Sequence, residues 1–535
     1  MGIITTTHNI HGGLHLDEKK SPACDVPIKE GEIAETLILP LNMHAGADAV
    51  PIVEVGQNVY RGQIIAEANS DGQVSANIHS PANGTISAIE PRPMSSRSGL
   101  SELSIVIQTT GDIETREQAS RWIDALKESP ERIAQTIEAA GIVGLGGAGF
   151  PTATKIAASV NAKKLLLNGA ECEPYICCDD RTMRDYAEQV IAGAFLIAKA
   201  AECDFIEIGT EDNKPEAISA MDDVINHLPE HMQKRIKLFV CPTKYPMGGE
   251  KQLLEAITGQ QVPSSTYPAE LGYLVHNIGT ALAVYNCMTR SEPLISRMVT
   301  LTGQAITQPG VYHLLLGTSI KDALLMAGVE ESQLNKVIHG GPMMGYPIQN
   351  LEAPITKITN CLIAATAEEL PTLPEEEPCI RCGQCAEVCP ATLLPQQLYW
   401  FARSEEFEKA EAFKIHDCIE CGLCSYVCPS YIPLVDYYRY AKSEIKQLDA
   451  AKVKSDRSKT KFDARNDRLE QERLEKQRIK AEKAKQRAAN KAANKDKNDA
   501  VAAALARVQA KKAEQQQQND TDSKDSPRSL KDSSS

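Results

Sequence analysis

The chain has 535 residues, too many for one hydrophobic core, so several domains are expected. Its hydrophobic content of 42% is ordinary for a water-soluble protein, and no stretch approaches the roughly 20 apolar residues that cross a bilayer. No N-terminal signal sequence is recognisable, so neither secretion nor a direct membrane span is expected. The net charge of −14 is uneven: residues 451–535 carry 23 Lys and Arg against 14 Asp and Glu, which leaves the remainder strongly acidic and gives no indication of nucleic-acid binding.

An N-terminal segment, residues 1–32, precedes a region of short predicted strands over residues 33–112. Residues 53–66 alternate around glycines that suit tight turns, and residues 79–86 repeat this pattern. The pair resembles the two halves of a barrel-sandwich hybrid of the biotinyl or lipoyl type. Carrier domains of that type hold a prosthetic group on a lysine at the hairpin tip. Residues 67–72 contain no lysine, so we expect a structural or docking module.

Residues 113–295 alternate helical patterns with short apolar runs, which predict buried strands of an α/β sheet. Within them, residues 144–155 read GLGGAGFPTATK, with four glycines in the first six positions. Glycines let a backbone approach a ligand closely and expose amides that can bind a phosphate, and Lys155 can add a positive charge. The segment is not a P-loop and fits the G-x-G-x-x-G dinucleotide pattern only loosely, so a plain turn remains an alternative.

Three more polar segments follow in the same region: NGAECEP from Asn168, YPMGGE from Tyr245 and VHNIGT from residue 275. The first comes directly after a predicted strand over residues 164–167. Ligands in α/β sheets bind at such carboxyl ends of strands, so a ligand site is indicated here. Taken singly, Lys155 and Glu173 also suit solvated surface charges, and His276 suits a structural histidine.

Residues 296–365 contain strand-like stretches, a predicted helix over residues 319–327, and the glycine-rich GGPMMG at residues 340–345. This order resembles a soluble-ligand-binding β-grasp module, the SLBB type. The acidic, proline-rich residues 370–378 then link it to the next domain.

Eight of the 16 cysteines fall within residues 366–450, in two runs that each read C-x2-C-x2-C-x3-C-P. This is the spacing of bacterial ferredoxins, in which the fourth cysteine ligates the cluster of the other run. Two [4Fe–4S] clusters are therefore predicted, with these ligands for cluster 1: Cys379, Cys382, Cys385 and Cys428. The ligands for cluster 2 are Cys418, Cys421, Cys424 and Cys389.

Zinc sites use separated cysteine pairs, and disulfides do not suit a chain without a secretory signal, so both alternatives are disfavoured. Residues 394–414 and 433–442 have helical rather than alternating patterns, which favours an α-helical dicluster ferredoxin domain. Cluster thiolates also need a reducing compartment, which indicates the cytoplasm.

The tail, residues 451–535, is rich in Lys, Ala, Glu and Gln and is predicted to be part helical and part disordered.

The four polar segments of residues 113–295, in this order, resemble the flavin- and NADH-binding subunit of respiratory complex I and its relatives. The barrel-sandwich region, the β-grasp module and the two predicted clusters narrow this resemblance. About residues 10 to 450 resemble the C subunits of Rnf electron-transport complexes. That resemblance implies non-covalent FMN with NADH stacked on its ring. It also implies a ferredoxin-like partner subunit, coupling to ion translocation, and a peripheral place on the cytoplasmic face of the bacterial inner membrane.

Carried over by position, the resemblance assigns the flavin phosphate and ribityl chain to Gly144, Gly146, Gly147 and Lys155. It places three polar residues along the flavin ring and nicotinamide: Asn168, Glu171 and Glu173. It closes the pocket with Tyr245, Gly248, Glu250, Asn277 and Thr280, and sets Phe150 near the dinucleotide. The chain departs from the family pattern at Leu145, Ala170, Gly249 and His276.

NADH delivers two electrons as a hydride, whereas a [4Fe–4S] cluster accepts one, and a flavin converts between the two. The expected function is therefore electron transfer between NADH and ferredoxin-type acceptors within an ion-translocating complex. No catalytic nucleophile or base is expected, because the cofactors carry the chemistry. Two alternatives are a soluble flavin and iron–sulfur cobalamin reductase, and a non-catalytic electron-wire or docking subunit without an NADH site.

Overall fold

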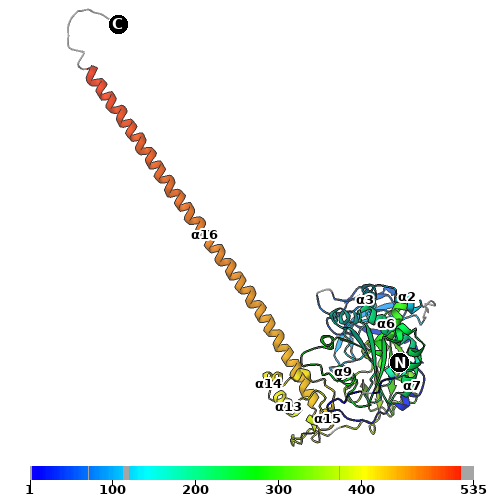
Figure 1. The fold of residues 1–535 in the computed structure, drawn as a ribbon. Helices are drawn as coiled ribbons and strands as arrows, with labels where there is room; N and C mark the ends of the chain where they lie inside the picture. The colour runs from blue at the N-terminus through cyan, green and yellow to red at the C-terminus, as the bar shows by residue number, and fades with distance from the viewer. Residues whose placement is uncertain (1–2, 6, 70–71, 112–119, 373, 520–535) are drawn as a thin grey trace, which may run out of the picture. The chain divides into compact units, whose positions relative to one another are not determined.

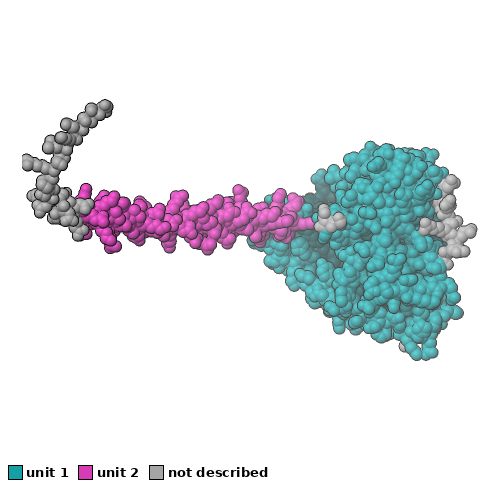
Figure 2. Space-filling model, turned by 90° about the horizontal axis from the view of Figure 1, so that it is seen from above, with its two compact units in different colours: residues 1–444 teal, residues 445–535 magenta. Residues whose placement is uncertain are grey.

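The computed structural model describes residues 3–5, 7–69, 72–111, 120–372 and 374–519, with side chains described as far as residue 516 (Figure 1). The chain forms two compact units, residues 1–444 and 445–535 (Figure 2). The predicted disordered end of the tail and the domain boundary at residues 112–113 lie outside the described residues. Within the described ranges, every helix is too short or too polar to span a bilayer.

Two small antiparallel sheets form the barrel-sandwich region. One has the order β2 (Thr36–Pro40), β8 (Ser101–Thr109), β7 (Gly84–Pro93), β4 (Asn58–Val59). The other has the order β3 (Val50–Pro51), β5 (Ile64–Glu67), β6 (Ile78–His79). Side chains that alternate along these strands, such as Leu37 and Leu39 of β2, meet in one buried core. The short helix α1 (Ser21–Cys24) precedes both sheets.

A four-stranded parallel sheet lies at the centre of the next domain, in the order β11 (Ile236–Cys241), β10 (Phe205–Glu211), β9 (Lys164–Asn168), β12 (Tyr273–Asn277). Both faces of β9 are buried, which explains its continuous apolar run. Leu165 and Leu167 pack in the same core as α3 (Pro130–Ala139), α6 (Ala187–Ala200) and α10 (Ile278–Arg290), whereas Leu166 packs with α9 (Glu250–Thr258).

The remaining helices of this domain are short connections or outer helices. They are α2 (Trp122–Ala125), α4 (Thr152–Ala158), α5 (Cys178–Asp185), α7 (Pro215–His227), α8 (Glu230–Gln233) and the 3-10 helix η1 (Pro268–Leu271).

The β-grasp region is a six-stranded mixed sheet in the order β1 (Lys29–Glu30), β14 (Gly310–Leu315), β13 (Ser296–Thr302), β17 (Cys361–Ala365), β15 (Lys336–His339), β16 (Tyr346–Pro347). Helix α11 (Ile320–Met326) begins at Ser319, whose hydroxyl accepts from the amide of Asp322. Strand β1 comes from the N-terminal segment and pairs with β14, an association that no sequence pattern indicated.

All regular elements among the described residues of the cluster domain are helices, as predicted. Its elements are α12 (Gln384–Glu387), α13 (Pro395–Arg403), α14 (Phe407–Ala412), the 3-10 helix η2 (Ile415–Asp417), α15 (Leu423–Tyr426) and the first turns of α16 (Leu434–Asn519). The helix predicted over residues 394–414 is interrupted, because Glu405 adopts a left-handed conformation with φ of 57°. Beyond the cluster domain, α16 continues as the predicted charged helical tail, and its described side chains from residue 446 onward are exposed.

Candidate functional site

The glycine-rich loop, residues 144–150, is closed at its base and open at its tip. The amide of Gly144 donates to the carbonyl of Phe150 (2.8 Å), and Val143 pairs with Pro151. The tip, residues 146–148, is exposed, and among the described residues no hydrogen bond engages its three amides. Gly147 has φ of 117°, and a Cβ there would meet no atom within 4 Å. Adjacent free amides of this kind form a ready anion site, so the tip fits a phosphate group.

The loop lies against the carboxyl end of the parallel sheet. The amide of Leu145 donates to the hydroxyl of Thr280 (3.0 Å), and Gly146 lies beside the side chain of Asn277. Asn277 caps α10 by accepting from the amide of Gly279, and its Nδ2 donates to a carboxylate oxygen of Asp179 (2.5 Å). The structure thus brings together the first and the last of the four polar segments.

The second and third polar segments meet at the same edge of the sheet. Asn168 pairs in register with Asn277 and donates to the carbonyl of Gly248 (2.9 Å). Lys155 forms an ion pair with Glu250, with Nζ–Oε1 at 3.1 Å. Beside them, burial and the charge of Lys155 lower the pKa of His276 well below its usual value, so this imidazole is neutral. Its buried Nε2 has no hydrogen-bond partner among the described residues.

Three other predicted site residues are engaged by neighbouring elements. Both carboxylate oxygens of Glu171 accept amides at the start of α5. Glu173 accepts from the amides of Met343 and Met344 in the β-grasp region, and burial raises its pKa. The hydroxyl of Tyr245 donates to the carbonyl of Cys421 (2.7 Å) in the cluster domain. Glu173 and Tyr245 thus join the α/β domain to its neighbours, whereas Glu171 holds the start of α5 within that domain. Phe150 remains 37% exposed beside the loop.

Two buried basic residues that the sequence reasoning missed also contact the glycine-rich loop or its base. Arg297 donates to the carbonyl of Leu145 (3.1 Å), and Lys357 donates to the carbonyl of Gly141 (2.8 Å). Both come from the β-grasp region, more than 150 positions away along the chain, and no local motif distinguishes either residue.

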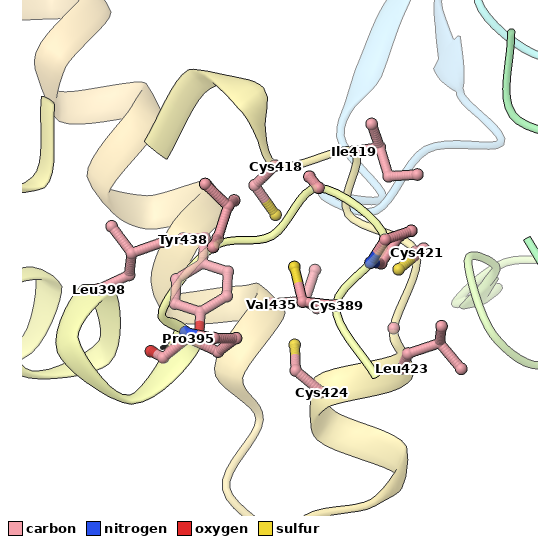
Figure 3. A pocket seen from close by; sticks show the side chains of 14 residues that line it. Cys389, Pro395, Leu398, Cys418, Ile419, Cys421, Leu423, Cys424, Val435 and Tyr438 are labelled. Atoms are coloured by element: carbon pink, nitrogen blue, oxygen red, sulfur yellow. Dashed lines mark hydrogen bonds between the residues drawn. The ribbon is translucent and has the colours of Figure 1, made fainter. Parts of the chain in front are cut away.

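The structure gathers the eight cluster cysteines into two sets around two cavities. The set predicted for cluster 2 lines one cavity, in which Cys389 of the first run joins three cysteines of the second (Figure 3). In this view the sulfur atoms of Cys389, Cys418 and Cys424 point into the space. The set predicted for cluster 1 lines a second cavity, in which Cys428 of the second run joins three cysteines of the first.

The chemistry of these donors fits an iron–sulfur cluster. Burial raises the pKa of Cys421 to about 12 and also raises the pKa of Cys418 and Cys389. A bound metal stabilises the thiolate form of such ligands, and its binding releases their protons. The walls of the cluster 2 cavity are apolar, with Leu398 and Leu423 fully buried, so the site also excludes water.

The two cysteine sets differ in their surroundings. Cys421 and Leu423 pack in one buried group with Tyr245 of the α/β domain, and Gly422 lies against the carbonyl of Met343. In the other set Cys382 is exposed, and the neighbouring Ile380 is 69% exposed. The cluster 2 set therefore faces the α/β domain, whereas the cluster 1 set lies at the surface.

Four family models match the chain in succession. They are the RnfC barrel sandwich hybrid domain at residues 8–112, the Nuo51 FMN-binding domain at 137–286, the SLBB domain at 298–347 and a 4Fe-4S dicluster domain at 378–432. They confirm the predicted kinds of domain, and with them FMN and [4Fe–4S] clusters as the cofactors.

Curated relatives, each named as the C subunit of an ion-translocating oxidoreductase complex, match most of the chain. The protein of Serratia proteamaculans is 42% identical over 94% of this chain and 69% of its own length. The protein of Pseudomonas aeruginosa is 43% identical over 87% of this chain and 59% of its own length. The protein of Klebsiella pneumoniae is 42% identical over 94% of this chain and 65% of its own length. The chain thus spans about three-fifths to two-thirds of these relatives. Among solved structures, a chain of the NAD+-reducing [NiFe]-hydrogenase in the H2-reduced state aligns at 19% identity with a TM-score of 0.43, covering 60% of this chain and 63% of that one.

Proposed function

Because the chain belongs to the family of C subunits of ion-translocating oxidoreductase complexes, we propose that it is the NADH-oxidising, electron-input subunit of such a complex. One observation carries the proposal: a loop with three exposed amides and two four-cysteine cavities lie in one compact unit. When bound, FMN and the two clusters supply the redox chemistry, turning a hydride into single electrons.

The residues of the loop and the sheet edge bind and orient the flavin. The exposed amides of residues 146–148 would receive its phosphate, and Lys155, which follows the loop on α4, is held in place by its ion pair with Glu250. Asn168 and Gly248, which are hydrogen-bonded to each other, line the same edge. The buried, neutral His276 adds no charge there.

The surroundings of the two cysteine sets support an order of electron transfer within the chain. Tyr245 joins the cluster 2 set to the domain that binds the flavin, so this set lies on the input side. The exposed surface around Cys382 and Ile380 makes the cluster 1 set the output side, where a ferredoxin-like partner would dock. Membership of an ion-translocating complex supports a peripheral place on the cytoplasmic face of the bacterial inner membrane.

The proposal is tested by anaerobic purification followed by flavin and iron analysis and by addition of NADH. We expect FMN, two clusters, NADH-dependent bleaching of the clusters, and reduction of an artificial acceptor. Gly147→Val should abolish FMN content and leave iron content intact, because a side chain at φ of 117° distorts the loop tip. Flavin-free wild-type protein whose clusters NADH does not bleach would contradict the proposal.

A further inference from the structure

A tight turn of the β-grasp region lies against the glycine-rich loop. This β-grasp turn, residues 356–359, is closed by two hydrogen bonds between Thr356 and Thr359, at 3.0 and 3.1 Å. Both threonines are fully buried. The turn presents its two central side chains, Lys357 and Ile358, to the neighbouring domains.

Lys357 joins three domains at a single atom. Its side chain is fully buried, and its Nζ donates to the carbonyls of Asn77 (2.6 Å) and Gly141 (2.8 Å). Asn77 belongs to the barrel-sandwich region, and Gly141 lies three residues before the glycine-rich loop. No carboxylate among the described residues forms an ion pair with Lys357. Burying a lysine without an acid costs folding free energy, and here the Nζ of Lys357 satisfies two carbonyl groups of other domains.

Two further contacts connect the same turn to the loop. The Cγ2 atom of Ile358 lies 2.8 Å from the position of a Cβ on Gly149, so only a glycine fits beneath it. Arg297, also buried, donates to the carbonyls of both Thr359 and Leu145, each at 3.1 Å. The loop and its base are therefore held at residues 141, 145 and 149, while residues 146–148 stay exposed.

We propose that Lys357 is a positioning residue for FMN: from the β-grasp turn it fixes the base of the glycine-rich loop so that the amides of residues 146–148 converge on the flavin phosphate. The inference rests on the proposed function. On this proposal the barrel-sandwich and β-grasp regions support the glycine-rich loop. The β-grasp region supplies Lys357, and the barrel-sandwich region supplies the carbonyl of Asn77 that Lys357 also contacts.

The charge state of Lys357 is consistent with this geometry. A neutral amine has two N–H donors, which match the two carbonyl acceptors, whereas an ammonium group would carry a third hydrogen without an acceptor among the described residues. Burial lowers the pKa of Lys357 to about 7. The titratable groups facing it are His44 and His79, whose pKa values burial lowers to about 4 and about 3, so both are neutral.

The test measures the FMN affinity of the anaerobically purified full chain, stripped of flavin, by quenching of FMN fluorescence. Lys357→Met should raise the Kd for FMN about tenfold or more, because two buried carbonyls lose their donor. Iron content should stay unchanged, and NADH-dependent reduction of an artificial acceptor should return to the wild-type rate at saturating FMN. Lys321→Met removes a lysine from an exposed ion pair of the same region and should leave the Kd unchanged.

Gly141→Ala disturbs the same contacts of Lys357 from the α/β domain. The new Cβ would collide with the carbonyl oxygen of Asn77, so the FMN affinity should fall as in the lysine variant. If Lys357→Met yields no iron-loaded protein, Ile358→Ala tests the same link by loosening the contact with Gly149. An unchanged FMN affinity in a folded Lys357 or Ile358 variant would overturn the inference. Wild-type protein that binds no FMN would instead overturn the proposed function.

Discussion

Cys389 and Cys428 each lie at the cavity formed by the run that does not contain them. Each of these cysteines precedes a proline and follows a short helix, α12 or α15. This exchange couples the two halves of the cluster domain, because neither cavity has four sulfur atoms until both halves have folded. Loss of one such cysteine should therefore affect the opposite run.

We predict that Cys389→Ala removes the same cluster as Cys418→Ala, although the two residues belong to different runs. Iron content should fall by about half in each variant, since a cubane held by three thiolates is labile. Low-temperature electron paramagnetic resonance should show the same signal missing in both, and a different one missing in Cys379→Ala. Cys203→Ala, at a buried cysteine outside both runs, is the control and should retain all iron. Identical spectra for the Cys389 and Cys379 variants would refute the pairing.

Lys357 should give the chain a measurable pH dependence of stability. Its pKa is lowered by burial from 10.5 to about 7, so between these values the unfolded chain holds a proton that the folded chain has released. Stability from this residue therefore rises with pH across that window, by at most about 1.4 kcal/mol per pH unit. Thermal melts of wild type and Lys357→Met at pH 7 and pH 9 should show a larger gain for the wild type. Equal gains would show that the amine stays charged.

The candidate site could be predicted from sequence only where its chemistry is local. The cysteine spacing and the glycine-rich loop each indicate their chemistry within one short segment of sequence. The engagement of Glu173 and Tyr245 by other domains could not be foreseen, because each partner lies more than 150 positions away. The same holds for Arg297 and Lys357, whose importance depends on burial at a junction rather than on any motif.

Among the elements, buried strands were the easiest to predict and short bridging segments the hardest. Strand β9 follows from an unbroken apolar run that is covered on both faces. Strand β1 has two residues and exists only because β14 offers it a free edge. The break between α13 and α14 could not be predicted from the sequence. Glu405 has a left-handed backbone conformation there, which is common for glycine but not for glutamate.

Helix α16 should depend on its charge pairs, because its exposed stretch has no apolar seam. Glu470–Arg473 and Glu475–Arg478 are ion pairs at i,i+3 spacing, each contributing about 0.3–0.5 kcal/mol. We predict that a peptide of residues 455–515 loses helicity between 10 mM and 1 M salt, as seen by circular dichroism. Replacing Glu470 and Glu475 with glutamine should lower the helicity at low salt and reduce the salt effect. A helicity that is insensitive to both changes would assign the stability of the helix to alanine content alone.

Within the unit of residues 1–444, contacts between domains lie between the candidate flavin site and the exposed surface around Cys382. Tyr245 links the α/β domain to Cys421, the N-terminal segment contributes a hydrogen bond from Gly13 to the carbonyl of Val388, and the cluster 1 set lies beyond. The proposed route therefore takes electrons from the flavin to the cluster 2 set first and to the exposed set second.

Removing each cluster in turn tests this order. In Cys418→Ala, NADH should still drive reduction of a small artificial acceptor but should no longer reduce cluster 1, because the intervening centre is gone. In Cys382→Ala, NADH should still reduce cluster 2, since that set packs against the α/β domain. Paramagnetic resonance of anaerobic samples frozen after NADH addition distinguishes these outcomes, and dithionite serves as the control that the remaining cluster is present and reducible. If NADH reduces cluster 1 in Cys418→Ala, electrons reach the output side by another path, and the exposed set rather than the buried one would be the partner of the flavin.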